Sequence, residues 1–377
     1  MNPDRFERLV AERRVVVCAG AGGVGKTTVA AALSLLAARR GRRVLCLTID
    51  PARRLADSLG ISLAPGVEAQ VGSELLAAVG AAPTGSLSIT MLDPKQVFDD
   101  LVKRHASSPA VAERILANQF YRHVSTSLAG TQSYMAMEKV LSVLKSGRFD
   151  LIVLDTPPTS EALDFLDAPE RLVEALDSPA MRWLVQSFQP STGFSMRLLA
   201  RGVAVMLKTM GRVTGRGFLE DMAAFVGELN ELFGGFKERA AEVSRAFRAK
   251  DFAYLLVAAP TPSALSEASF FSERLRRLGL VADALVLNRV HSNAPVSASP
   301  GELLAALGER AVSVRPEQLL RAQADEQERA RAEAPQLARA QELFGAEQLW
   351  LVPVMAGDVR GLSDLAKVSA ALVGGAR

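Results

Sequence analysis

Glycines, a lysine and two threonines near the start of the chain have the spacing of a loop that binds phosphate. In the segment VVVCAGAGGVGKTTV, residues 15–29, the pattern GxxxxGK[ST] begins at Gly20 and ends at Thr27. Its glycines can adopt positive φ, and their missing side chains let backbone amides close around an anion. The expected phosphate-binding residues are Gly20, Ala21, Gly22, Gly23, Val24, Gly25, Lys26, Thr27 and Thr28.

Two side chains of this loop have a defined chemical task. The Lys26 ammonium would place a point charge beside the β- and γ-phosphates of a nucleotide, and the Thr27 hydroxyl would be a ligand for Mg²⁺. A helix that begins here directs its positive end at the same anion. A glycine-rich turn followed by a chance Lys-Thr is the alternative, but it does not account for the strand and helix patterns on either side.

Two aspartates follow apolar runs further along the chain. Asp50 follows the run 43–48 and precedes Pro51, so it is either a turn or helix-cap residue, or it accepts a proton from, or orients, a water that attacks the γ-phosphate. Asp155 follows the apolar run 149–154, which is where a P-loop nucleotidase needs an acid beside its Mg²⁺. Residues 155–161 would form a second loop that senses phosphate.

A parallel sheet would bring these residues together. Residues 26–40 read as a helix between two strands, and a strand–helix–strand unit implies parallel pairing. Ligands of such sheets bind at the carboxyl ends of the strands, where the loop, Asp50 and Asp155 all lie. Further strands are expected at 87–91, 253–259, 281–287 and 349–352, and further helices at 94–104, 262–278, 316–343 and 361–373.

Residues 181 to about 247 have no strand pattern, and they contain five of the ten methionines. Met196, Met206 and Met210 lie with other apolar residues at spacings of three and four, which predicts amphipathic helices. These helices either pack on the sheet or form an adaptable groove for a protein or hydrophobic client, for which flexible thioethers are suited. We expect one α/β domain over residues 1–377, with a helical subdomain inserted at 178–250.

Composition limits the partners and the compartment. The net charge is only +3, so no nucleic acid partner is expected. No apolar segment is long enough to span a bilayer, and the N-terminus lacks a secretory signal pattern, so we expect no stable membrane insertion and a cytoplasmic protein. Cys18 and Cys46 both lie in apolar strand patterns, where they are expected to be inert core thiols.

Three segments of the chain follow one another in a distinctive order: residues 20–28, Asp50-Pro51-Ala52 and Asp155-Thr156-Pro157-Pro158-Thr159. With these segments in this order, the chain resembles the arsenite-pump and tail-anchored-protein-targeting ATPases, a family of the deviant P-loop (Walker A) class. The resemblance covers most of the chain. It implies a doubly wound, mostly parallel sheet with a helical subdomain, working as a dimer that closes on ATP and Mg²⁺.

The resemblance also implies roles for single residues. Lys26 and Thr28 would contact phosphate, Asp50 the hydrolytic water, and Thr27 and Asp155 the metal and its shell. Lys26 and Asp50 are therefore the expected catalytic residues. Near the end of the chain, Leu287-Asn288-Arg289 and Pro353 resemble the segments that read adenine in this family. The expected base contacts are Asn288 and Pro353.

The chain departs from the family pattern at several positions. Ala21 replaces a lysine that reaches the partner subunit's phosphates, Arg53 replaces a histidine, and Ser160-Glu161-Ala162 replaces Gly-His-Thr. The cysteine pair that clamps zinc and the cysteines that would bind arsenite are also missing. Three consequences of Ala21 stay open: a slow homodimer, replacement of the lysine by Arg53 or Arg54, or a heterodimer with a related subunit that carries the lysine.

Three functions are compatible with these patterns. The first is an ATP-driven switch, a slow ATPase that binds a protein or hydrophobic client through its helical subdomain. The second is an ATP-dependent positioning or scaffold factor that docks on a polymer or a membrane-associated partner. The third, a metalloid-efflux ATPase, needs thiolate ligands that two strand cysteines do not supply.

Overall fold

The computed structural model describes residues 3–50, 63–118, 131–179, 235–291 and 315–374, and between them positions 55, 59, 61, 121–122, 125, 299, 301–302 and 305. The chain divides into two compact units. The first, here called the sheet unit, comprises Met1–Met91, Gly147–Ala162 and Lys250–Arg377. The second, here called the helical unit, comprises Leu92–Ser146 and Leu163–Ala249.

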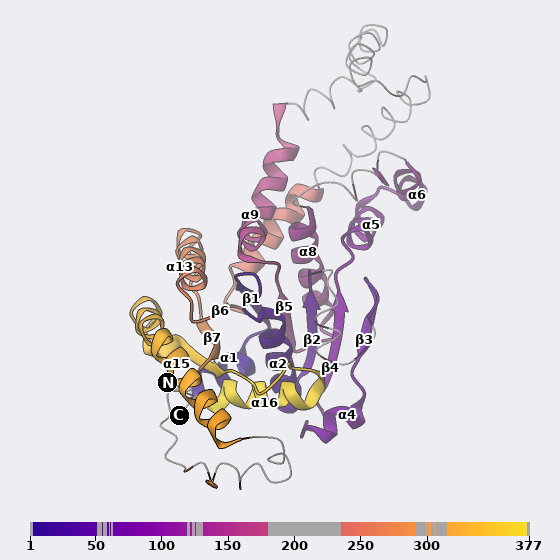
Figure 1. Ribbon diagram of the computed structural model, residues 1–377. Helices are drawn as coiled ribbons and strands as arrows, with labels where there is room; N and C mark the ends of the chain where they lie inside the picture. The colour runs from indigo at the N-terminus through magenta and orange to yellow at the C-terminus, as the bar shows by residue number, and fades with distance from the viewer. Residues whose placement is uncertain are drawn as a thin grey trace, which may run out of the picture. The chain divides into compact units, whose positions relative to one another are not determined.

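The sheet unit is built on an eight-stranded sheet with the order β3-β4-β2-β5-β1-β6-β7-β8 (Figure 1). Every neighbouring pair is parallel except β3 with β4, which is antiparallel. The strands are β1 (Val15–Gly20), β2 (Arg43–Thr48), β3 (Glu68–Gln70), β4 (Ser86–Met91), β5 (Leu151–Asp155), β6 (Phe252–Ala258), β7 (Ala284–Val290) and β8 (Leu349–Pro353).

The central strands form the core of the sheet unit. All six residues of β1 and all five of β5 are buried, which is why their sequences are continuous apolar runs rather than an alternating pattern. In the register between them, Cys18 lies opposite Asp155, so the end of β5 lies beside the end of β1. The Asp155 side chain at this end of the two strands is therefore buried in the sheet unit.

Helices cover both faces of this sheet. The connection from β1 to β2 and the connection from β6 to β7 run in opposite directions across the strand order, so right-handed crossovers place α2 and α13 on opposite faces. The buried Ser369 hydroxyl of α16 donates to the Ala32 carbonyl of α2 at 2.6 Å. The helices of the unit are α1 (Pro3–Glu12), α2 (Lys26–Arg39), α4 (Ser73–Ala78), α13 (Pro262–Arg277), α15 (Pro316–Phe344) and α16 (Gly361–Gly374), with the short 3-10 helix η2 (Ala346–Gln348).

The helical unit contains α5 (Pro94–His105), α6 (Pro109–Ala117), α8 (Thr131–Ser146), most of α9 (Thr159–Leu176) and a helical stretch described over 235–247. A buried ion pair joins two of them: the Arg239 guanidinium bonds the Glu138 carboxylate of α8 at 2.6–2.9 Å. The predicted insertion at 178–250 covers only part of this unit. Residues 180–234, which contain Met196, Met206 and Met210, lie outside the described residues. The inserted subdomain and its groove for a client therefore stay predictions.

The α/β fold with a mostly parallel sheet is confirmed, and most element bounds agree with the sequence pattern. The pattern did not predict the short edge strand β3, α1 or α4. It also ended the strand before Asn288, whereas β7 continues to Val290. That extension matters because it places Asn288 inside the sheet, beside the loop after β1.

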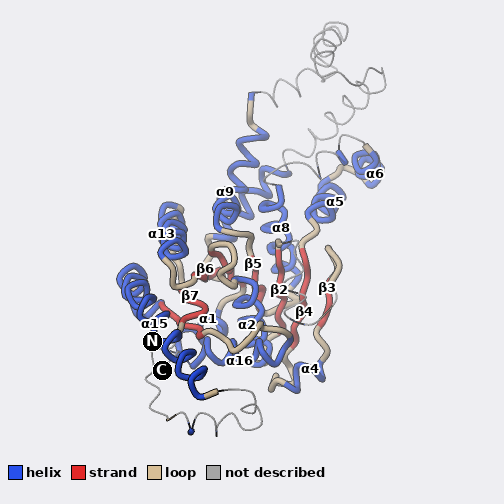
Figure 2. The backbone as a smooth tube through the Cα atoms, viewed as in Figure 1, coloured by secondary structure: helices blue, strands red, loops and turns tan. Residues whose placement is uncertain are grey.

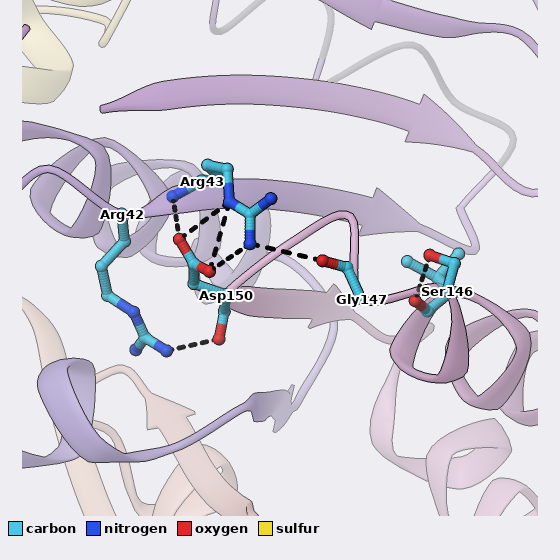
Figure 3. Close-up of polar contacts among 6 residues, drawn as sticks. Arg42, Arg43, Ser146, Gly147 and Asp150 are labelled. Carbon is cyan, nitrogen blue, oxygen red and sulfur yellow. Dashed lines mark hydrogen bonds and ion pairs between the residues drawn. The ribbon is translucent and has the colours of Figure 1, made fainter. Parts of the chain in front are cut away.

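Two neighbouring arginines fasten the amino end of the sheet, opposite the loop. Figure 3 shows the Arg43 guanidinium facing the Asp150 carboxylate, with nitrogen–oxygen distances of 2.7–3.3 Å. The Arg42 guanidinium instead donates to three backbone carbonyls, those of Val10, Arg13 and Asp150. Burial lowers the pKa of Arg42. Arg42 therefore joins the end of α1 to the start of β5.

Arg42→Ala should lower the free energy of unfolding by about 2 to 3 kcal/mol, because three carbonyls lose a charged donor. Urea unfolding followed by circular dichroism measures this loss. The matched control is Arg43→Ala, which removes an exposed ion pair and should cost a small fraction of that amount. Equal losses from the two substitutions would contradict the assigned role of Arg42.

Candidate functional site

Glycines set the backbone of the loop that follows β1 and leads into α2, the helix labelled in Figure 2. A Cβ atom at Gly20 would lie 2.0 Å from the Val257 carbonyl oxygen of β6, so only glycine fits there. Gly23 and Gly25 have φ of 76° and 92°, in the region that favours glycine. No side chain caps the amino end of α2. The positive end of this helix is therefore open to an anion.

Lys26 begins α2 and folds back over the loop. Its side chain is buried, and Nζ donates to the Ala21 carbonyl oxygen at 2.8 Å. Ala21 itself is 7% exposed, so position 21 presents a small buried side chain and no cation. Arg53 and Arg54, the residues proposed to replace the missing lysine, lie outside the described residues.

Asp155 is the most buried charged group of the site. Its carboxylate is 0% exposed, and Oδ2 accepts hydrogen bonds from the Thr27 hydroxyl at 2.8 Å and the Thr48 hydroxyl at 3.0 Å. Burial raises the pKa of Asp155 to about 6, against the lowering effect of the two hydroxyls and Lys26. The second oxygen, Oδ1, has no hydrogen-bond partner among the described residues. An unpartnered buried carboxylate oxygen next to a threonine hydroxyl fits the oxygen ligands that Mg²⁺ prefers.

Asp50 belongs to the same hydrogen-bonded group. Its backbone N–H donates to the Thr48 hydroxyl oxygen at 3.2 Å, and that hydroxyl in turn donates to Asp155. Asp50 is half-buried, and its negative charge adds to the raised pKa of Asp155. Thr48 thus connects two of the predicted acidic residues. Thr48 was not singled out from the sequence, although a hydroxyl residue at the end of an apolar strand pattern could have indicated a member of the site.

The segment after β5, which was predicted to sense phosphate, has a fixed residue near its start. Thr156 is buried, and both its backbone N–H and its hydroxyl donate to the Cys18 carbonyl oxygen, at 3.2 and 2.8 Å. These bonds tie the segment after β5 to the strand that leads into the phosphate loop. The side chains of 159–164 lie outside the described residues, so the replacement of Gly-His-Thr at 160–162 has no structural description.

The end of β7 contacts the phosphate loop directly. Asn288 is buried, and its side-chain amide donates to the Val24 carbonyl oxygen at 2.8 Å. The exposed Arg289 donates from Nη1 to the Gly23 carbonyl oxygen at 3.2 Å. Pro353 lies opposite Val290 at the end of β8. Contact of Asn288 and Pro353 with a base stays a prediction. The contact of Arg289 was not predicted, because a strand-end arginine has no distinctive spacing.

Both cysteines are buried in the sheet, as predicted. Cys18 and Cys46 are each 0% exposed, and β5 lies between their strands. Burial raises the pKa of both thiols, that of Cys46 to about 12. Neither is available as a thiolate. Within the described part of the chain, no group of three or more His, Cys, Asp or Glu side chains forms a metal site, and none of the helices could cross a membrane.

Comparison with known sequences identifies the family of the chain. The family profile described as "Anion-transporting ATPase" matches residues 13–301, from β1 to beyond β7. The chain belongs to the anion-transporting ATPase family. The resemblance found in the sequence is thereby confirmed, and the matched region contains the phosphate loop, Asp50, Asp155 and Asn288.

The known proteins that resemble the chain carry two kinds of name. "ATPase get3" of Aspergillus terreus is 32% identical over 167 residues, which are 43% of this chain and 45% of that protein. "Putative arsenical pump-driving ATPase" of Chlorobaculum tepidum is 30% identical over 159 residues, 42% of this chain and 36% of that protein. "ATPase get3" of Pyrenophora tritici-repentis is 25% identical over 225 residues, 56% and 63% of the two chains. The chain thus spans about half the length of these relatives.

Asp155→Asn should stabilise the ligand-free chain by about 1 to 3 kcal/mol, because a neutral amide avoids the cost of burying a charge. The pKa of Asp155 is raised in the folded chain, so its ionisation destabilises the fold as pH rises from about 4 to about 6 and costs a constant amount above that. The gain of the variant should appear over the same range. Urea unfolding of both proteins at several pH values measures it.

Asp150→Asn is the matched control at the other end of β5. The hydrogen bond from Arg43 lowers the pKa of Asp150, so its ionised form stabilises the fold above the unfolded pKa, and that contribution is lost at lower pH. This control should lose stability at neutral pH. If Asp155→Asn is destabilised at neutral pH in the same way, its carboxylate does not carry the burial cost assigned here.

Proposed function

We propose that this chain binds ATP with Mg²⁺ and hydrolyses it slowly, as an ATP-driven switch. The observation that carries the proposal is the chain of hydrogen bonds from Thr27 through Asp155 and Thr48 to Asp50, at the end of the phosphate loop. The Thr27 hydroxyl and the Asp155 carboxylate would bind a metal, and the carboxylate of Asp50, whose backbone N–H ends this series of bonds, would orient a water. Membership of the anion-transporting ATPase family supports the same reaction.

The phosphates would be bound by the loop amides, the amino end of α2 and Lys26. The Lys26 ammonium is bonded to the Ala21 carbonyl, so it is held over the loop. A phosphate oxygen would replace that carbonyl as its partner, and Thr28 would add a further hydroxyl contact. Because the positions are set before binding, little reorganisation is needed to stabilise negative charge.

Thr27 and Asp155 would hold Mg²⁺, which when bound neutralises charge on the β- and γ-phosphates. Asp155 keeps the Thr27 hydroxyl oriented by accepting a hydrogen bond from it at 2.8 Å. Asp50 would orient the attacking water and accept its proton. The backbone N–H of Asp50 donates to the Thr48 hydroxyl at the end of β2, and this bond holds the backbone from which the Asp50 side chain extends.

We further propose that the chain works as a dimer and binds a protein or hydrophobic client through residues 178–250. The support is the methionine-rich sequence of that segment and the relatives named "ATPase get3". Ala21 cannot act across a subunit interface, so a slow homodimer, a pair with a lysine-bearing relative, and replacement by Arg53 or Arg54 all stay open. The cytoplasmic location likewise stays a prediction.

A positioning or scaffold factor remains the alternative, since it would use the same nucleotide site and differ only in its partner. Metalloid efflux is disfavoured by a specific observation. Both cysteines of the chain are buried in non-adjacent strands with raised pKa values, so they do not offer thiolates for arsenite.

Lys26→Ala should weaken ATP binding by about 30-fold to 100-fold, because a charge-assisted hydrogen bond to phosphate is lost. Calorimetric titration with ATP and Mg²⁺ measures this. Lys367→Ala, which removes an exposed lysine of α16 in the same unit, is the control and should bind as the parent does. Unchanged ATP affinity in Lys26→Ala would refute the proposed phosphate site.

Asp50→Asn should retain ATP binding and lower turnover by about 10²-fold to 10⁴-fold, because the water loses its proton acceptor while the phosphate loop is unchanged. Phosphate release under saturating ATP measures the turnover. Asp251→Asn, at the amino end of the sheet, is the control and should hydrolyse ATP at the parent rate. A parent-like rate for Asp50→Asn would leave Asp50 as a turn residue only.

A further inference from the structure

Arg289 has an unusual backbone conformation. Among the described residues other than glycine, it alone has a positive φ, of 63°. It lies in a register shift between Asn288 and Val290, where β7 pairs with β8. A left-handed residue with a Cβ atom is strained by roughly 1 kcal/mol or more, and such strain is concentrated at functional sites.

The bulge at Arg289 points two consecutive side chains at one target. In a regular strand, neighbouring residues point to opposite faces of the sheet. Here Asn288 and Arg289 both donate to the phosphate loop, the first to the Val24 carbonyl at 2.8 Å and the second to the Gly23 carbonyl at 3.2 Å. A Cβ atom at Gly25 would lie 2.2 Å from the Asn288 amide nitrogen, so the strand end lies directly against the loop.

Holding two carbonyls also orients two amides. In a trans peptide, the C=O of one residue and the N–H of the next point in opposite directions. With the Gly23 carbonyl turned toward Arg289, the N–H of Val24 points away from β7. With the Val24 carbonyl turned toward Asn288, the N–H of Gly25 does the same. These two N–H groups belong to the loop that the pattern assigns to phosphate.

We propose that Arg289 is a positioning residue: by holding the Gly23 carbonyl from outside, it keeps the phosphate loop in its anion-binding conformation before any ligand arrives. The proposal rests on the proposed nucleotide function and deepens it. Lys26 holds the loop through the Ala21 carbonyl and Asn288 holds it through the Val24 carbonyl, so Arg289 adds a third contact, at Gly23, between these two. Preorganised donors cost little reorganisation when charge is bound.

Arg289→Gly tests this, because glycine accepts φ of 63° without strain and removes the whole side chain, the guanidinium included. The probes are ATP, inorganic tripolyphosphate and adenosine, each titrated against the full chain. We expect affinity for ATP and tripolyphosphate to fall about fivefold to tenfold, adenosine binding to stay as in the parent, and the thermal unfolding midpoint of the free chain to stay or rise.

A second readout separates positioning from direct charge. In the ligand-free protein, hydrogen–deuterium exchange at residues 22–25 should be faster in Arg289→Gly than in the parent, and Arg289→Lys should restore part of the protection. The control is Arg277→Ala, which removes an exposed arginine of α13 and should change neither exchange nor affinity.

Each other outcome overturns the proposal. Parent-like tripolyphosphate affinity and loop exchange in Arg289→Gly would show that the contact does nothing. Weaker phosphate binding with unchanged exchange would make Arg289 a direct phosphate ligand, and an equal loss for ATP and adenosine with tripolyphosphate unchanged would make it a base contact. A parent chain that binds neither ATP nor tripolyphosphate would refute the nucleotide function, and the positioning role with it.

Discussion

The buried carboxylate of Asp155 is the constraint on which the site depends. A fully buried charge is costly, and here two threonine hydroxyls, from the start of α2 and the end of β2, offset part of that cost. The same bonds hold the ends of β2 and β5 and the first turn of α2 together. One oxygen of the carboxylate stays without a hydrogen-bond partner in the described structure, and the pKa of Asp155 is raised to about 6. The buried charge of Asp155 therefore lowers the stability of the fold, and a cation bound to the carboxylate would offset that cost.

The phosphate loop is held by contacts that do not involve a ligand. Its start packs so closely on β6 that Gly20 cannot have a side chain, and its carbonyls are bonded by Lys26, Asn288 and Arg289. A glycine-rich loop loses much conformational entropy when it is ordered. Distributing that cost over the fold means that little of it falls on ligand binding. At the opposite, amino end of the sheet, Arg42 and Arg43 bond Asp150 and so join the start of β2 to the start of β5.

The sequence predicted most strands and helices of the sheet unit and most residues of the candidate site, for reasons that differ from one element to the next. The fully buried strands β1 and β5 have continuous apolar runs, and α2 follows a loop whose glycine spacing is specific to phosphate binding. The edge strand β3 was missed because its three residues, Glu68 to Gln70, have neither an apolar run nor a clear alternation. Thr48 and Arg289 were missed because their roles come from register and a bulge between strands distant in sequence. Asn288 was singled out by resemblance, yet its bond to Val24 could be found only in three dimensions.

We infer that the loop, Thr27, Asp155 and Asp50 form one site for ATP with Mg²⁺. Calorimetric titration of the unmodified chain with ATP, with and without Mg²⁺, tests this. We expect one nucleotide bound per chain and an affinity about tenfold or more higher with Mg²⁺, because the metal relieves the buried charge of Asp155. Absence of ATP binding, or an affinity that does not respond to Mg²⁺, would contradict the claim.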